Sequence, residues 1–142
     1  MKRLVMSFAA VTVLALAVPA VAATPTLKID RPWLLKTSTG NKSLAAGGTY
    51  KHCSAQHIQE IDARGHVSGA TKGASYKAVW RKDGVKIITF TEHWSKTSGK
   101  VTVATLSNQS DNLPDGKYKV TARQNGKALA SSSISLKTKS GC

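Results

Sequence analysis

The chain has 142 residues, of which 21 are Lys or Arg and only 7 are Asp or Glu, so its formal charge is +14. A chain of this length forms one small domain. The apolar fraction of 41% overstates the core, because both Met and a dense run of Ala, Val and Leu lie in the first 23 residues. Composition therefore indicates a class of protein and a compartment, but it points to no reaction.

The first residues have the pattern of a secretory signal peptide. Lys2 and Arg3 precede an apolar stretch over residues 4–18, and Pro19 and several small residues follow. The stretch is too short for a membrane span, and small residues suit a signal peptidase. We therefore expect a signal peptide over residues 1–22, cleaved after Ala22 or Ala23, with an uncleaved anchor as the alternative. The mature chain is then a soluble, basic protein without a membrane span, periplasmic or secreted.

Two cysteines remain in the mature chain, Cys53 and the final residue Cys142. Disulfides form and persist in exported proteins, so one intramolecular bridge is the expected state. The alternatives are a free thiol, an intermolecular bridge or a metal ligand.

The strand pattern is weak before Cys53 and clearer after it. Residues 23–52 predict an N-terminal extension, with one edge strand around Leu27 and Ile29 and a mobile loop rich in small and polar residues over 37–48. Residues 53–142 form the predicted domain, in which residues 57–62 make a first short strand.

From residue 74 onward, apolar and polar residues alternate with the period of a strand. Lys77, Val79 and Arg81 lie on one face of the first such strand, and a turn at Asp83-Gly84 follows. The next strand, over residues 85–92, changes face at Ile87-Ile88, which indicates burial on both sides or a bulge.

The last strands surround a tight turn at Asn125-Gly126. A regular two-residue hairpin would place serines opposite the core and leave Ile134 outside. We therefore expect a one-residue bulge within residues 131–133, with Ile134 fully buried. With the run over residues 100–107, the chain contains about seven strands. This number predicts an all-β antiparallel sandwich of two sheets, with a β-barrel as the alternative.

Several motifs over residues 57–137 resemble those of bacterial immunoglobulin-like accessory domains. They are Ala78-Val79-Trp80 with Asp83-Gly84, then Leu113-Pro114-Asp115-Gly116-Lys117-Tyr118-Lys119-Val120, then Asn125-Gly126-Lys127. The resemblance implies an immunoglobulin-like sandwich in which Trp80 lies in the core and the Tyr118 hydroxyl fixes the preceding connection, as in a tyrosine corner. Val120 stands where antibody domains have cysteine, so the inter-sheet disulfide of those domains is absent.

No catalytic residues are expected. The motif from Gly65 to Gly69 places its serine one position too late for a nucleophile elbow and lacks the strand-to-helix context. Glu60 and Asp62 share a strand face, but a solvated sheet edge explains them better than acid–base catalysis. His52, His57 and His66 are weak candidates for a metal site, because oxidation of Cys53 removes its thiolate. We expect no cofactor.

Charge is the most informative feature for function. Lys117, Lys119 and Arg123 project from one side of a predicted strand. If Lys77 and Arg81 occupy the adjacent strand, as the resemblance implies, one sheet presents a basic outer face, with Lys127 on the following hairpin. Such a face attracts anionic polymers. The alternative is that these lysines only keep the protein soluble and protect its sheet edges.

Three functions are consistent with these patterns. The first is a non-catalytic exported domain, expected to be a monomer, that binds an anionic envelope polymer or a protein partner. The second is a secreted inhibitor or accessory subunit that inserts residues 37–48 into another exported protein. The third is a small histidine-based metal-binding protein. The few aromatic residues fall in core phase, so sequence-specific binding of nucleic acid is not expected.

Overall fold

The computed structural model describes residues 22–108 and 112–142, and every regular element in them is a strand. The strands are β1 (Thr26–Lys28), β2 (Trp33–Thr37), β3 (Gly40–Leu44), β4 (Thr49–His52), β5 (Ile58–Ser68), β6 (Ser75–Lys82), β7 (Val85–His93), β8 (Gly99–Ser107), β9 (Gly116–Gln124) and β10 (Lys127–Thr138). The expected all-β class is confirmed, with more strands than the sequence indicated. Residues 1–21, expected to belong to a signal peptide, lie outside the described residues.

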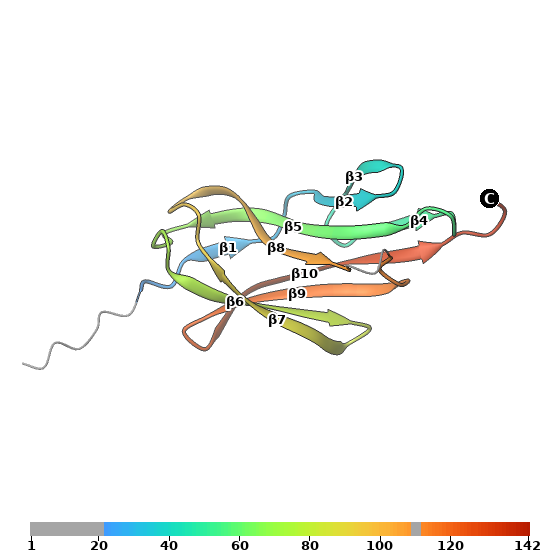
Figure 1. Cartoon of the computed structure of the whole chain (residues 1–142). Coiled ribbons are helices and arrows are strands. Elements are labelled where there is room, and N and C mark those ends of the chain that lie inside the picture. Colours follow the sequence, from blue (N-terminus) through green and yellow to red (C-terminus); the bar gives the residue numbers. More distant parts are fainter. Residues whose placement is uncertain (1–21, 109–111) are drawn as a thin grey trace, which may run out of the picture.

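The strands form two sheets, which lie as upper and lower layers in Figure 1. The first sheet has the order β1-β5-β2-β3, with β8 also paired to β5, and the second has the order β4-β10-β9-β6-β7. This two-sheet arrangement is compatible with a β-sandwich, as expected. The expectation of a wholly antiparallel fold is wrong, because β4 joins the second sheet parallel to β10.

The segment before Cys53 is part of both sheets. It contributes β1, β2 and β3 to the first sheet and β4 to the second. Trp33 and Leu35 of β2 are completely buried. The strand expected around Leu27 is present as β1 at the edge of the first sheet, but three further strands follow it before Cys53, and the expected mobile loop over residues 37–48 is wrong. The polar residues of that stretch form β3, an edge strand whose side chains are mostly exposed, so no apolar alternation marks it.

Strand β5 is longer than the predicted strand over residues 57–62, and it continues past a close backbone contact. At Gly65 an added Cβ would collide with the carbonyl of Lys28. Only glycine allows the chain after β1 to lie this close to β5.

The core lies between the two sheets and is rich in aromatic rings. Trp33 of the first sheet meets Trp80 of the second edge-to-face, with ring centroids 5.9 Å apart. The Tyr76 hydroxyl donates to the carbonyl of Val103 at 2.5 Å, and burial raises the Tyr76 pKa above its ordinary value. Trp94 stacks on Tyr76 and donates its indole N–H to Gln124. The expected core position of Trp80 is confirmed.

Both predicted hairpin turns are present. Asp83 and Gly84 between β6 and β7 have positive φ angles, as do Asn125 and Gly126 between β9 and β10. Two consecutive positive φ angles match the twist of the flanking strands. The Tyr118 hydroxyl donates to the carbonyl of Pro114 at 2.6 Å, so it does fix the preceding connection.

The register between β9 and β10 shifts once, as the hydrophobic phase requires. The shift lies between Ala128 and Ala130, so the bulge is at Leu129, and its predicted place within residues 131–133 is wrong. A bulge beside the turn leaves the long remainder of the ladder regular, and the serines pair without interruption. Ile134 then faces Tyr118 and is 1% exposed, which confirms its predicted burial.

A second bulge lies in the edge strand β7. The pairing of β7 with β6 skips Ile87, between Ile88 and Lys86. The change of face at Ile87-Ile88 therefore comes from a bulge and not from burial on both sides. Val85, Ile87 and Ile88 are all exposed.

The burial of Ile134 gives a stability prediction. Ile134→Ala should lower the free energy of unfolding by roughly 2–5 kcal/mol, because it leaves a cavity against Tyr118 and the opposite sheet. Urea unfolding followed by circular dichroism measures this loss. Leu129→Ala, at the half-buried bulge, is the matched control and should lose clearly less. Equal losses at the two positions would contradict this description of the core.

Candidate functional site

The outward side of the second sheet carries a dense set of cations. Side chains alternate along each strand, so residues between the buried ones point away from the core. All of these cations are exposed except Arg81, which is half-buried. We call this set the basic face: Lys51, Lys77, Arg81, Lys86, Lys117, Lys119, Arg123 and Lys137.

Cations on the basic face stand directly opposite one another across neighbouring strands. Between β6 and β9, Lys77 faces Arg123 and Arg81 faces Lys119. Arg81 also faces Lys86 of β7. At the other edge of the sheet, Lys51 of β4 faces Lys137 of β10. Like charges in directly opposite positions destabilise a sheet, so each pair is unfavourable in the free protein.

The carboxylates are placed elsewhere. None of the described Asp and Glu residues lies on the basic face, and three of them are on the outer side of the first sheet or next to it. There Lys36 faces Glu60 and binds it at 2.5 Å. In the described pairings of the first sheet, no Lys or Arg faces another Lys or Arg. The second sheet thus places like charges opposite one another, whereas the first sheet pairs a cation with a carboxylate.

Hydroxyl groups fill the space between the cations. Thr121 and Ser131 are bonded to each other at 2.8 Å, and Lys77 donates to Thr91 at 2.5 Å. A shallow depression of about 390 Å³ lies at the β9–β10 turn end of the face, lined by Lys77, Arg123 and neighbouring residues. Hydroxyls and cations together suit an anion with several oxygen atoms.

Most of the residues predicted for anion binding are brought together. Lys77, Arg81, Lys117, Lys119 and Arg123 occupy neighbouring positions of β6 and β9. The structure does not place Lys127 with them.

Lys127 pairs with Gln124, whose side chain is buried, so Lys127 lies at the rim of the sheet and not on its outer face. The prediction also omitted Lys51 and Lys86. The bulge at Ile87 shifts the phase of Lys86, and the long-range pairing of β4 positions Lys51. A pattern read along a single strand reports neither effect.

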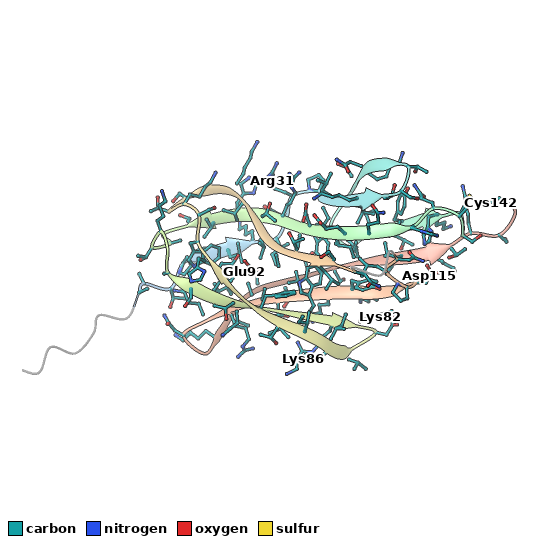
Figure 2. The ribbon with its side chains drawn as sticks, viewed as in Figure 1. Arg31, Lys82, Lys86, Glu92, Asp115 and Cys142 are labelled. Carbon is teal, nitrogen blue, oxygen red and sulfur yellow. A yellow bond between two sulfur atoms is a disulfide. The ribbon has the colours of Figure 1, made fainter. Side chains whose placement is uncertain are left out.

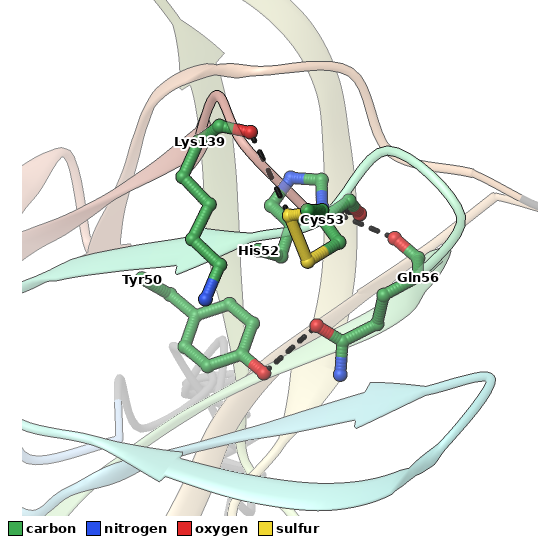
Figure 3. Close-up of a disulfide and its surroundings, with 6 residues drawn as sticks. Tyr50, His52, Cys53, Gln56 and Lys139 are labelled. Atoms are coloured by element: carbon green, nitrogen blue, oxygen red, sulfur yellow. Dashed lines mark hydrogen bonds between the residues drawn. A yellow bond between two sulfur atoms is a disulfide. The ribbon is translucent and has the colours of Figure 1, made fainter.

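At the end of the sheet, a disulfide joins the last residue to the end of β4. Cys53 and Cys142 are bonded, with Cα atoms 5.7 Å apart and a separation of 89 positions in the sequence, as the sequence predicts. Figure 3 shows this bond beside His52, Gln56 and Lys139. The Lys139 amide donates to the carbonyl of His52 at 2.9 Å, which continues the pairing between β4 and β10.

His52 is only 3% exposed and forms the centre of this connection. Its Nδ1 lies 3.0 Å from the carbonyl oxygen of Cys53 and 3.1 Å from that of Gln56, and its Nε2 lies 3.0 Å from Asp115 Oδ1. All three partners of the ring are oxygen atoms, two of backbone carbonyls and one of a carboxylate. Tyr50 stacks on the ring.

Asp115 binds the chain end from the other side. Its second oxygen accepts the Thr138 amide at 2.6 Å. Burial alone would raise the pKa of Asp115, but the hydrogen bonds from Thr138 and His52 outweigh burial and lower that pKa below its ordinary value. We call the disulfide together with His52 and Asp115 the C-terminal clasp.

The other candidate residues are engaged separately. Glu60 pairs with Lys36, and Asp62 accepts from the Thr105 hydroxyl at 2.6 Å. His66 pairs with Asp30, away from His52. Within the described residues, no three His, Cys, Asp or Glu side chains are grouped to hold a metal ion.

Comparison with known proteins gives no family. No protein-family model matches the chain, and no curated protein sequence matches it significantly. Among the described residues, no helix is long and apolar enough to cross a membrane.

Reversing one charge of a facing pair should stabilise the free protein. Lys119→Glu places a carboxylate opposite Arg81 and should raise the free energy of unfolding by roughly 0.2–1 kcal/mol at low salt. The gain should shrink at high salt, because screening weakens exposed pairs. Urea unfolding at two NaCl concentrations measures both effects. Lys127→Glu makes the same change of charge opposite Gln124, and an equal gain there would contradict the facing-pair argument.

The clasp gives a prediction of pH dependence. The pKa of Asp115 is lowered in the folded state, so its ionised form stabilises the fold above the ordinary carboxyl pKa, and this contribution is lost as pH falls through the folded pKa. Asp115→Asn should therefore reduce the free energy of unfolding by about 1 kcal/mol at pH 6 and by clearly less at pH 2. Asp30→Asn, in an exposed pair with His66, should have a smaller effect at pH 6. A loss at Asp115 that is the same at both pH values would contradict the assignment.

Proposed function

We propose that this protein is a non-catalytic, exported domain that binds an anionic polymer of the cell envelope through the basic face. The observation that carries the proposal is the set of facing cations without a carboxylate among them. Each facing pair costs some free energy in the unbound protein. For a small domain with a net stability of about 5–15 kcal/mol, four such pairs are a considerable burden. An anion bound between the cations removes this repulsion.

The dimensions of the face favour a polymer over a small anion. Neighbouring strands lie about 4.8 Å apart, and residues two positions apart on one strand are about 6.8 Å apart. The face extends across all five strands of the second sheet, or roughly 19 Å. A single phosphate or carboxylate reaches one pair of cations, whereas a chain of anionic groups contacts several at once and releases more counterions.

The partner needs no aromatic stacking surface. Trp33, Trp80, Trp94, Tyr76 and Tyr118 are buried, and none lies on the basic face. Base stacking is the usual means by which proteins hold unpaired nucleic acid. The proposed contact is instead electrostatic, supported by the Ser and Thr hydroxyls. It reads charge density and not sequence.

Export and the immunoglobulin-like assignment belong to the same proposal. The N-terminal sequence pattern supports export, and the Cys53–Cys142 disulfide is compatible with an oxidising compartment. The Tyr118 hydroxyl bond and the buried Trp80 agree with an immunoglobulin-like domain. We propose binding and not catalysis because both ring nitrogens of His52 already have hydrogen-bond partners and both cysteines are joined in the disulfide. The inhibitor alternative needed a loop at residues 37–48, where β3 lies.

Neutralising the centre of the basic face tests the proposal. Replacing Lys117, Lys119 and Arg123 with Gln should weaken binding to a soluble sulfated polysaccharide at least tenfold and flatten its dependence on salt, because fewer counterions are released. The fold should be retained, since exposed substitutions change stability by about 0.5 kcal/mol or less. Calorimetric titration at several NaCl concentrations measures the affinity and its salt slope.

A second triple variant separates the face from the net charge. Lys42, Lys72 and Lys100 are exposed and lie off the basic face. Replacing them with Gln removes the same charge and should reduce the affinity far less. Equal losses in the two variants would show that only total charge matters, and the proposal would be wrong.

A further inference from the structure

The three large aliphatic side chains exposed in the described part of the chain all belong to β7. Val85 is 72% exposed, Ile87 is 50% exposed and Ile88 is 39% exposed. They lie within four consecutive positions, directly after the β6–β7 turn. A contiguous exposed apolar patch on a basic, otherwise polar surface indicates a contact with an apolar partner. We call these three residues the aliphatic edge.

The aliphatic edge borders two depressions. One, of about 370 Å³, is lined by Val85 and Ile87 together with Lys82, Asp83 and Lys86. The other, of about 330 Å³, extends from Ile87 and Ile88 to Leu106 and Leu113 at the end of the first sheet. Ile87 contributes to both. The apolar surface thus continues from the edge of one sheet toward the other.

Cations adjoin this apolar surface. Lys86 lies between Val85 and Ile87 in the chain, and it faces Arg81, which in turn faces Lys119. A row of three cations therefore leads from the aliphatic edge into the basic face. Figure 2 shows Lys82 and Lys86 on the β6–β7 hairpin. The ligand that complements such a surface has an anionic head next to an apolar chain.

Strand addition by a peptide suits this edge poorly. The bulge at Ile87 interrupts the regular ladder of β7, and Lys86 stands beside it. Bulges and lysines are the features that natural proteins use to prevent pairing at an open edge. A second copy of the chain, paired through β7, would bring two rows of cations together. An acyl chain needs no hydrogen bonds from the edge and avoids both problems.

We propose that the β6–β7 hairpin docks on an anionic lipid bilayer, with the aliphatic edge in the acyl layer and the row from Lys86 to Lys119 on the lipid headgroups. The proposal rests on the proposed function only for those cations, which belong to the basic face. Apolar side chains that enter the interface and cations that meet anionic headgroups add to each other in peripheral membrane binding.

Asp83 determines which side of the hairpin enters. Its carboxylate accepts the Lys117 amide at 2.9 Å and pairs with Lys82 at 3.0 Å, and these contacts lower its pKa below the ordinary value. The turn therefore keeps a charged group, which is costly to place in hydrocarbon. The hairpin enters along the side of β7, with the turn at headgroup level.

The test compares vesicles with a soluble polyanion. Wild-type protein should co-sediment with vesicles that contain about one third anionic phospholipid and not with purely zwitterionic vesicles. Replacing Val85, Ile87 and Ile88 with Ser should weaken vesicle binding about tenfold or more, because apolar burial is lost. The same variant should keep its affinity for the soluble sulfated polysaccharide, which carries no acyl chain. Leu34→Ser, on the first sheet, is the control and should bind vesicles like wild type.

Insertion has a direct readout of its own. Val85→Trp places an exposed indole on the aliphatic edge, while the native Trp residues are buried. Its fluorescence should shift to the blue on anionic vesicles and should be quenched by brominated acyl chains. Absence of quenching, or unchanged vesicle binding by the triple Ser variant, would overturn the proposal. So would tight binding of an extended acidic peptide that competes with vesicles for the aliphatic edge.

The outcomes also separate this proposal from the proposed function. Loss of vesicle binding in the triple Ser variant with polysaccharide binding retained supports both. Vesicle binding by wild type that needs the aliphatic edge, with no polysaccharide binding at all, supports lipid docking and contradicts the polymer proposal. Polysaccharide binding without vesicle binding supports the polymer proposal and contradicts lipid docking.

Discussion

The alternation of side chains along β9 is the constraint on which the rest of the structure depends. Tyr118 and Val120 enter the core, while Lys119 between them points outward opposite Arg81. A slip of one residue would bury the lysines and expose the core. The register is therefore held at both ends, by the Tyr118 hydroxyl bond at one and by the bulge at Leu129 near the other. One strand fixes both the stability of the domain and the charge of its surface.

Local patterns in the sequence predict the central hairpins well. Asn125-Gly126 and Asp83-Gly84 mark turns through backbone angles that few other residues adopt, and the alternation in β6 and β9 is undisturbed, so Trp80, Ile134 and the outward cations were predictable. The position of the bulge was harder to predict, because a bulge at Leu129 and one within residues 131–133 both turn Ile134 toward the core. Strand β4 escaped prediction because its partner, β10, is distant in sequence. Strand β3 is too polar to show alternation, and only its pairing with β2 makes it a strand.

The C-terminal clasp and the basic face are mechanically connected. Among the described strands, β4 is an edge strand that pairs with β10 alone, and within that pairing Lys51 faces Lys137. Repulsion between these lysines acts against a short edge strand. The disulfide and the His52–Asp115 contact lie within a few residues of this lysine pair and hold the ends of β4 and β10 together. Strand β4 has only four residues, so its pairing with β10 alone would resist the repulsion between Lys51 and Lys137 weakly. The covalent bond next to it allows this edge of the basic face to carry like charges.

The bulge at Ile87 determines which side chains of β7 belong to the basic face. In a regular strand, Lys86 and Ile88 would share one face and Ile87 the other. The extra residue brings Lys86 opposite Arg81 while Ile88 stays opposite Trp80, so a cation and an aliphatic residue that regular pairing would place on one face lie on opposite faces of the sheet. The bulge also makes this edge a poor template for another strand. The same local irregularity therefore adds Lys86 to the basic face, leaves Ile88 on the opposite face of the same edge and protects that edge from strand pairing. An amphiphilic anion that reaches this edge would meet a cation on one side of the strand and an aliphatic side chain on the other.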